Sequence, residues 1–145
     1  MADPITIIGT AGAIANIVDL LGKTISTLND LQNQWKIADL TVMAFKSQLL
    51  VFKEALRRIL AWAEGTSTEN HHELLLCLES SVMCCRLLVA KIDDEVTQLE
   101  TTAEGQLNLA SKVKLLFKTK DMEEVQRKID QQTHALNLLL SVCNL

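Results

Sequence analysis

Four residues close together in this sequence have side chains that can bind a transition metal: Glu69, His71, His72 and Glu73. Glu69 and His72 have the Glu-x-x-His spacing that carboxylate metal sites use in helical bundles. Such a site needs several of these sets on facing helices, and this one copy falls at the start of a predicted helix. Adjacent histidines also point to different faces of a helix. We therefore expect no metal site and no cofactor.

The cysteines are a second group with chemical potential. Cys77, Cys84, Cys85 and Cys143 lack the C-x-x-C spacing and lie in apolar runs, so we expect reduced core residues rather than a zinc site or a disulfide framework. Palmitoylation of the Cys84-Cys85 pair is a weaker alternative. The sequence also lacks a glycine-rich phosphate loop and a local nucleophile signature. These observations predict no catalytic residues, and we expect a protein that is not an enzyme.

Charge narrows the range of partners. The formal net charge is −4, whereas nucleic-acid-binding domains usually carry a basic surplus, so we expect no nucleic-acid partner. One basic cluster surrounds the apolar run from Leu115 to Phe117 and offers possible contacts to anionic lipid headgroups. Its members are Lys112, Lys114, Lys118 and Lys120. Acidic residues follow from Asp121 onward, which favours the alternative that this cluster is simply a solvated face.

Composition and residue spacing predict an all-α protein. Hydrophobic residues make up 48% of the chain, good helix formers dominate, and the one proline, Pro4, follows Asp3 as a first helical position follows an N-cap. Apolar steps of three and four predict helices from Pro4 to about Asn33, about Asp39 to Gly65, after Asn70 to about Thr101, and about Asp121 to the end, with a short one over 109–117. This order predicts an antiparallel helical bundle of four long helices plus one short helix.

The first predicted helix carries the main functional signal. It has no charged residue between Asp3 and Asp19 and is apolar nearly all round, which predicts burial in a protein core or in lipid. Its small residues have the small-xxx-small spacing that lets helices pack closely in lipid. The uncharged run is shorter than the roughly 20 residues that span a bilayer, so a tilted or interfacial helix is the form to expect. The candidate residues for membrane insertion or oligomer contacts are Ile5, Ile7, Ile8, Gly9, Gly12, Ile14, Ile17 and Val18.

Two features concern the chain as a whole. The first lysine is Lys23, so the start lacks the basic region of a signal peptide, and we expect a cytoplasmic protein. The chain stops within an apolar helical pattern at Leu145, whereas the ends of natural domains are usually solvated. We therefore expect residues 1–145 to form one domain at the N-terminus of a longer protein. A very short natural protein of the same kind is the alternative.

Several segments resemble one known family, the fungal HeLo-like domains at the N-terminus of STAND/NLR-type receptors and ankyrin-repeat proteins. The most specific match is the opening, MADPITIIGTAGAIANIVDL, followed by the segment 20–25, LLGKTI. Weaker matches are ADLT at 38–41, SQLL at 47–50, the pattern from Ala55 to Trp62, and ALNLLL at 135–140. The resemblance covers essentially the whole chain.

This resemblance implies a fold and a function. The fold is a helical bundle similar to HeLo and to the N-terminal bundle of the necroptosis executioner. The implied function is that of a cell-death effector in fungal immunity or heterokaryon incompatibility, whose N-terminal helix targets or permeabilises the plasma membrane after oligomerisation. Its partners would be itself, membrane lipids and a downstream receptor or amyloid-motif segment. A non-lytic protein-interaction module of a STAND receptor is the alternative.

Two further expectations concern the movement and association of the bundle. Trp35 and Trp62 are expected to be exposed apolar residues that favour self-association. The first helix is expected to detach more easily than the others, because its small residues bury less apolar area. A polar hinge over residues 32–36 would allow that release.

Overall fold

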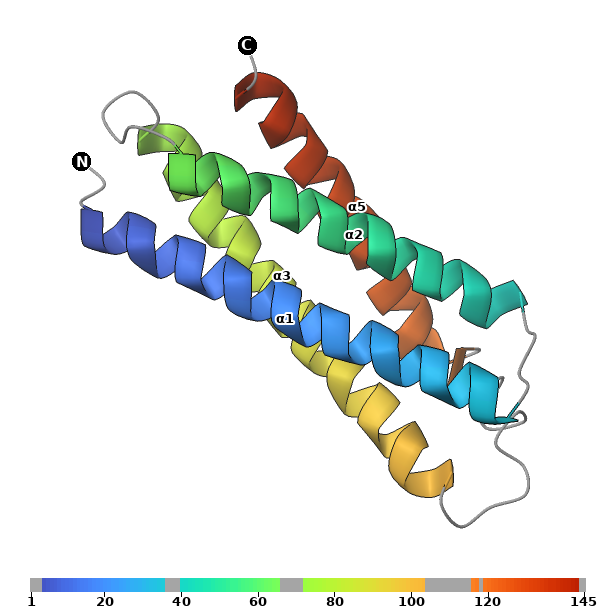
Figure 1. Cartoon of the computed structure of the whole chain (residues 1–145). Helices are drawn as coiled ribbons and strands as arrows, with labels where there is room; N and C mark the ends of the chain where they lie inside the picture. The colour runs from blue at the N-terminus through green and yellow to red at the C-terminus, as the bar shows by residue number, and fades with distance from the viewer. Residues whose placement is uncertain (1–3, 36–39, 66–71, 104–115, 118, 144–145) are drawn as a thin grey trace.

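The computed structural model describes the backbone of residues 4–35, 40–65, 72–103, 116–117 and 119–143, and the side chains of 9–33, 40–64, 74, 76–99, 116–117 and 119–142. These residues form four long α-helices and no strand: α1 (Pro4–Trp35), α2 (Leu40–Gly65), α3 (His72–Ala103) and α5 (Lys120–Cys143). The all-α prediction is therefore confirmed (Figure 1), and the observed helix ends lie within about two residues of the predicted ones, apart from the predicted end of the last helix, which lies outside the described residues. The predicted short helix over 109–117 lies outside the described residues except for Leu116 and Phe117.

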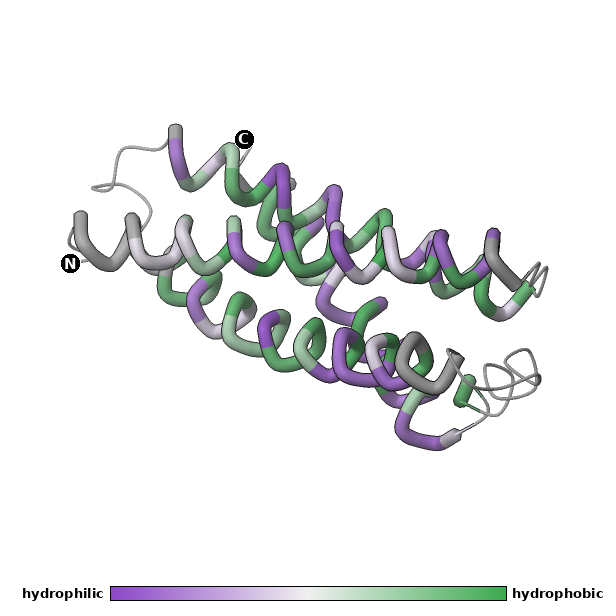
Figure 2. The backbone as a smooth tube through the Cα atoms, turned by 60° about the horizontal axis from the view of Figure 1, so that its bottom comes forward, coloured by the Kyte–Doolittle hydropathy of each residue, from purple (hydrophilic) through white to green (hydrophobic). Residues whose placement is uncertain are grey.

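The helices follow from the apolar spacing of the sequence. In α2 the apolar residues that recur at steps of three and four are all buried: Val42, Phe45, Leu49, Phe52, Leu56, Ile59 and Ala63. At the start of α5, the Thr119 hydroxyl accepts a hydrogen bond of 3.2 Å from the Met122 amide, as an N-cap does, and Asp121 and Glu123 lie in the first turn. Along the tubes of Figure 2, hydrophobic and hydrophilic residues alternate with the period of amphipathic helices.

The order of the helices around the bundle is α1, α2, α5, α3. Both α1 and α5 pack against α2 and α3. Lys46, early in α2, donates hydrogen bonds to Asn29 and Gln32, late in α1, so these two helices run in opposite directions. Thr24 in α1 donates to Asp93 in α3, and earlier residues of the same two helices face each other, so α1 and α3 run in the same direction.

The second pair of neighbours repeats this arrangement. Gln48 donates to Asp130, and Trp62 lies beside Asn137, so α2 and α5 run in the same direction. The bundle thus combines neighbours of both directions, as Figure 1 shows. The antiparallel bundle that the sequence predicts is therefore not confirmed in that form. The apolar period of a helix tells which side is buried but not which helix covers it.

The core runs the length of the bundle between the four helices. Phe45 of α2 meets Phe117 edge to face, with ring centroids 5.1 Å apart and an interplanar angle of 64°. Ile14, Leu21, Ile92 and Ile129 are fully buried in the same cluster, which joins α1, α3 and α5. The described part of α1 is therefore an integral wall of this core.

The predicted all-round burial of the first helix is wrong for its described side chains. Gly9, Gly12, Asn16 and Asp19 are exposed and form one solvent-facing side of α1. The sequence has no charged residue between Asp3 and Asp19, so its apolar pattern looked continuous around the helix. Glycine, however, adds little apolar surface to that pattern. No helix of the described residues is long and apolar enough to cross a membrane.

Candidate functional site

The residues proposed for membrane contact do not form one surface in the folded bundle. Ile14 and Ile17 point into the core, where their side chains are 0% and 3% exposed. Val18 is half-buried against that core, while Gly9 and Gly12 face solvent. The backbone of residues 5–8 is helical, but the side chains of Ile5, Ile7 and Ile8 lie outside the described residues. Any use of this set as one apolar face requires α1 to leave its present position.

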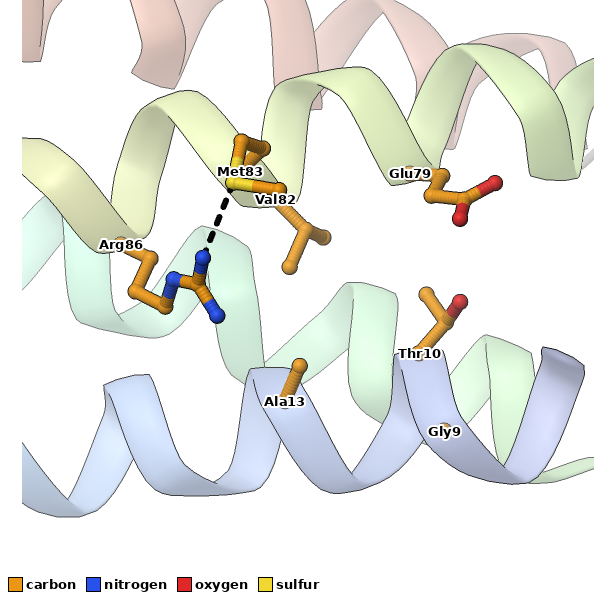
Figure 3. Close-up of a pocket in the computed structure, with 7 residues that line it drawn as sticks. All are labelled: Gly9, Thr10, Ala13, Glu79, Val82, Met83 and Arg86. Atoms are coloured by element: carbon orange, nitrogen blue, oxygen red, sulfur yellow. Dashed lines mark hydrogen bonds between the residues drawn. The ribbon is translucent and has the colours of Figure 1, made fainter.

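A groove of about 290 Å³ lies between the first half of α1 and the first half of α3. On the α1 side it is lined by Gly9, Thr10 and Ala13, and on the α3 side by Glu79, Val82, Met83 and Arg86. Figure 3 shows Val82 and Ala13 facing each other across the gap, with Glu79 and Arg86 at opposite ends. The small α1 residues leave this space, because they are too short to reach α3.

The glycines of this segment have room around them. A Cβ atom placed at Gly9 or at Gly12 would meet no atom within 4 Å. By contrast, a Cβ at Gly22 would lie 3.4 Å from the Lys53 ammonium nitrogen. Glycine within a helix destabilises it by about 1 kcal/mol relative to alanine. The folded bundle therefore carries this loss of stability at Gly9 and Gly12 without a steric need for it.

The second half of α1 is held more firmly. Ile25, Leu28 and Leu31 are all buried. Thr24, 1% exposed, donates to the Leu20 carbonyl at 2.9 Å and to the Asp93 carboxylate at 3.4 Å, which links α1 to α3. These contacts contrast with the groove near Gly9, so the two halves of α1 differ in how well they pack.

The predicted polar hinge at 32–36 is wrong for the residues described there. The helix continues through Trp35, and the Gln32 side chain accepts a hydrogen bond of 2.8 Å from the Lys46 ammonium. The same ammonium donates to Asn29, also at 2.8 Å. The two side-chain amides thus join α1 to α2. Lys36, the last residue of the predicted hinge, lies outside the described residues.

The cysteines occupy different environments. Cys85 is buried as predicted, whereas Cys77 is exposed, which corrects the expectation of a core residue. Burial, and secondarily the neighbouring Cys84 thiol, raises the pKa of Cys85 from 9.0 to about 12. At neutral pH this thiol stays protonated and is a poor nucleophile. Cys143 lies outside the described side chains.

The remaining candidates contribute no site to the described part of the chain. Lys120 is exposed at the start of α5, while Lys112, Lys114 and Lys118 lie outside the described residues. The side chains from Glu69 to Glu73 are also outside them. No group of three or more potential metal ligands occurs among the side chains that the structure describes. Asp93 is half-buried within α3 and accepts the hydrogen bond from Thr24.

A second hollow lies between the ends of α2 and α5. Its volume is about 570 Å³, and its lining includes Arg58, Trp62, Asn137 and Ser141. Trp62 is half-buried against the core, so the prediction of an exposed indole is wrong. Neither hollow was predicted, because a groove between two helices depends on which helices become neighbours. Met83, an apolar residue among polar ones that lines the groove, was the available signal in the sequence.

Comparison of the chain with protein-family models, with curated proteins and with solved structures found no match.

Proposed function

We propose that this chain is a HeLo-like domain that acts as a cell-death effector, in fungal immunity or heterokaryon incompatibility. It rests in the cytoplasm as a folded bundle, with the short helix over 109–117 as a fifth element. When a downstream receptor or amyloid-motif segment brings copies together, α1 leaves the bundle and targets or permeabilises the plasma membrane. The proposal assigns no catalytic step and no cofactor to the chain.

The observation that carries this proposal is the state of Gly9 and Gly12. Both are exposed with open space at their Cβ positions, so the folded bundle gains nothing from glycine there. Small residues at helix positions favour close helix packing in membranes. A second, membrane-bound state of α1 accounts for residues that the first state does not need.

The groove beside Gly9 and Ala13 supports release from the same end. The groove leaves space between this part of α1 and α3, and segments with fewer buried contacts open at lower free energy. Release still has to remove Ile14 and Ile17 from the core, at about 1.5–3 kcal/mol for each fully buried side chain. Because release of α1 costs this free energy, the bundle stays closed until a trigger acts, as a latent effector should.

A specific observation also favours the second candidate, a non-lytic interaction module. Large apolar side chains remain exposed on α2, α3 and α5 of the folded bundle, among them Leu50, Leu87 and Leu138. Such residues can bind a protein partner without any release of α1. Under this alternative the domain gathers receptor copies, and another protein acts on the membrane.

Dye release from phosphatidylserine vesicles distinguishes the two. The test protein is the whole chain fused to a chemically induced dimerisation domain, so that oligomerisation is forced. The key variant is Gly12→Glu, which points into open space in the bundle but places a charge on the membrane-bound face. The matched control is Ser26→Glu, exposed on the same helix in its firmly held half.

We expect wild type and Ser26→Glu to release dye and Gly12→Glu to fail, with identical circular dichroism spectra. Leakage by Gly12→Glu equal to wild type would contradict the role of α1. If the folded, oligomerised wild type releases no dye, the effector proposal is wrong and the interaction module takes its place.

A further inference from the structure

The outward face of α3 carries an apolar stripe that no part of the described bundle covers. Leu76, Met83 and Leu87 are 51%, 51% and 64% exposed, and the small residues Ser80 and Ala90 complete the stripe. Leu76, Met83 and Ala90 are seven residues apart, which keeps them on one side of a helix. A second helix can pack against an apolar stripe with this seven-residue spacing.

Two charged residues border the stripe on its α1 side. Glu79 and Arg86 are both exposed, and both line the groove with Gly9 and Ala13. They are seven residues apart, about 10 Å along the axis, and they form no ion pair with each other in the described bundle. Among the described residues neither of them has an oppositely charged partner; Arg86 instead donates to the Met83 sulfur at 3.0 Å.

We propose that this face binds a second copy of the chain, α3 against α3 in antiparallel orientation, with a two-fold axis through Met83. Figure 3 shows Glu79 and Arg86 at opposite ends of the groove. The two-fold axis brings Glu79 of each copy to Arg86 of the other copy, so the contact contains two such ion pairs. It also places Leu76 opposite Ala90 and Leu87 opposite Ser80 and Glu79. Leu76 thus meets the small Ala90, Met83 meets its own copy on the axis, and each charge gains an opposite charge.

Charge complementarity is what identifies the partner as a second copy. A two-fold contact is self-complementary, so one surface has to carry both members of each ion pair at equal distances from the axis. Glu79 and Arg86 lie four and three residues from Met83, about 6 and 4.5 Å along the helix axis, so their distances from the two-fold axis differ by only about 1.5 Å, which their side chains can span. The exposed face of α2 with Leu40, Met43, Leu50 and Val51 is also apolar, but its exposed positions from 40 to 51 hold no charge that would fix a register.

The contact is small and therefore reversible. One helix face buries less than the roughly 1,200 Å² in total that separates weak encounters from standard interfaces. The dimer should thus form at high local concentration, such as a receptor assembly provides. It belongs to the folded bundle and does not depend on the membrane activity proposed above, so dimerisation and leakage are measured separately.

Charge reversal tests the geometry. We expect sedimentation equilibrium at low salt to show a monomer–dimer equilibrium for the wild type. Glu79→Arg or Arg86→Glu alone places like charges together twice and should weaken the dimer by about tenfold. The double variant carrying both reversals should restore the wild-type dissociation constant. Because the two residues do not pair within one chain, restoration reports contact between copies.

A matched pair of substitutions tests the apolar centre. Met83→Glu brings two carboxylates together on the axis and should abolish the dimer, whereas Leu50→Glu makes the same kind of change at a similarly exposed site on α2 and should have no effect. Circular dichroism verifies that each variant is folded. A wild type that stays monomeric at high micromolar concentration would overturn the proposal. So would a double reversal no tighter than the singles, or a dimer sensitive to Leu50→Glu but not to Met83→Glu.

Discussion

Gly9 and Gly12 are the residues at which the stability of the folded bundle and its proposed activity have different requirements. The bundle leaves open space where their side chains would be, and a helix prefers alanine to glycine. These glycines do not stabilise the folded bundle. They are explained if, in a membrane-bound state, α1 packs closely against another helix. Stability measurements can separate these two requirements.

Gly12→Ala should raise the free energy of unfolding by about 0.5–1 kcal/mol, because alanine has the higher helix propensity and meets no neighbour here. Gly22→Ala is the comparison: its new methyl group would lie 3.4 Å from the Lys53 ammonium nitrogen, an ordinary van der Waals contact, and should yield a gain of similar size. Denaturant unfolding monitored by circular dichroism gives both values. A loss of stability at Gly12→Ala would show that the position is crowded.

Cys85 should be chemically silent in the folded protein. Its raised pKa keeps the thiol neutral, so at pH 8 iodoacetamide should modify the exposed Cys77 first and Cys85 only as the bundle unfolds. Peptide mass spectrometry over time measures both rates. Equal rates for the two cysteines in the folded protein would show that Cys85 is accessible.

The same pKa has a consequence for stability at high pH. In the unfolded chain the Cys85 thiol ionises near 9.0, but in the bundle it does so near 12. Its contribution is fully present below pH 9.0 and is lost as pH rises towards 12, because only the unfolded state releases the proton. The free energy of unfolding of the wild type should therefore fall more steeply over this range than that of Cys85→Ala.

The helices themselves were largely predictable, because their apolar steps and caps are local. The α2 stripe from Val42 to Ala63 is buried throughout, and Thr119 caps α5 beside the predicted start. The groove beside Gly9 was not predictable, since it arises from the pairing of α1 with α3 in the same direction. Small residues give no periodic signal, so the exposed side of α1 could not be separated from its buried one.

At the scale of one element, the first half of α1 borders the groove, while its second half is joined to α2 and α3 by side-chain hydrogen bonds. Lys46 of α2 makes two of these hydrogen bonds, each of 2.8 Å, to Asn29 and Gln32 of α1. Lys46→Ala should therefore speed hydrogen exchange of the amides from Leu28 to Asn33 and leave those of α5 unchanged. Unchanged exchange in that segment would mean that apolar packing alone holds the end of α1.

The whole molecule is proposed to meet the membrane after its copies are gathered, and its basic cluster is proposed as a contact to anionic lipid headgroups. Each lysine near an anionic surface contributes about 1 kcal/mol. Replacing Lys112, Lys114, Lys118 and Lys120 by glutamine should weaken binding to phosphatidylserine vesicles and reduce its dependence on salt. Vesicle co-sedimentation measures this, with neutral vesicles as the control. Binding that survives all four replacements would assign the lysines to a solvated face.

The central claim is that the first half of α1 is the part of the folded bundle that opens most easily. Hydrogen exchange of the native protein tests it most directly, because exchange reports the free energy of local opening. The account predicts faster exchange for the amides between Ile7 and Leu21 than for those between Leu49 and Ile59 in α2. If α1 is instead the slowest-exchanging helix, it is a structural core element, and its release does not occur in this protein.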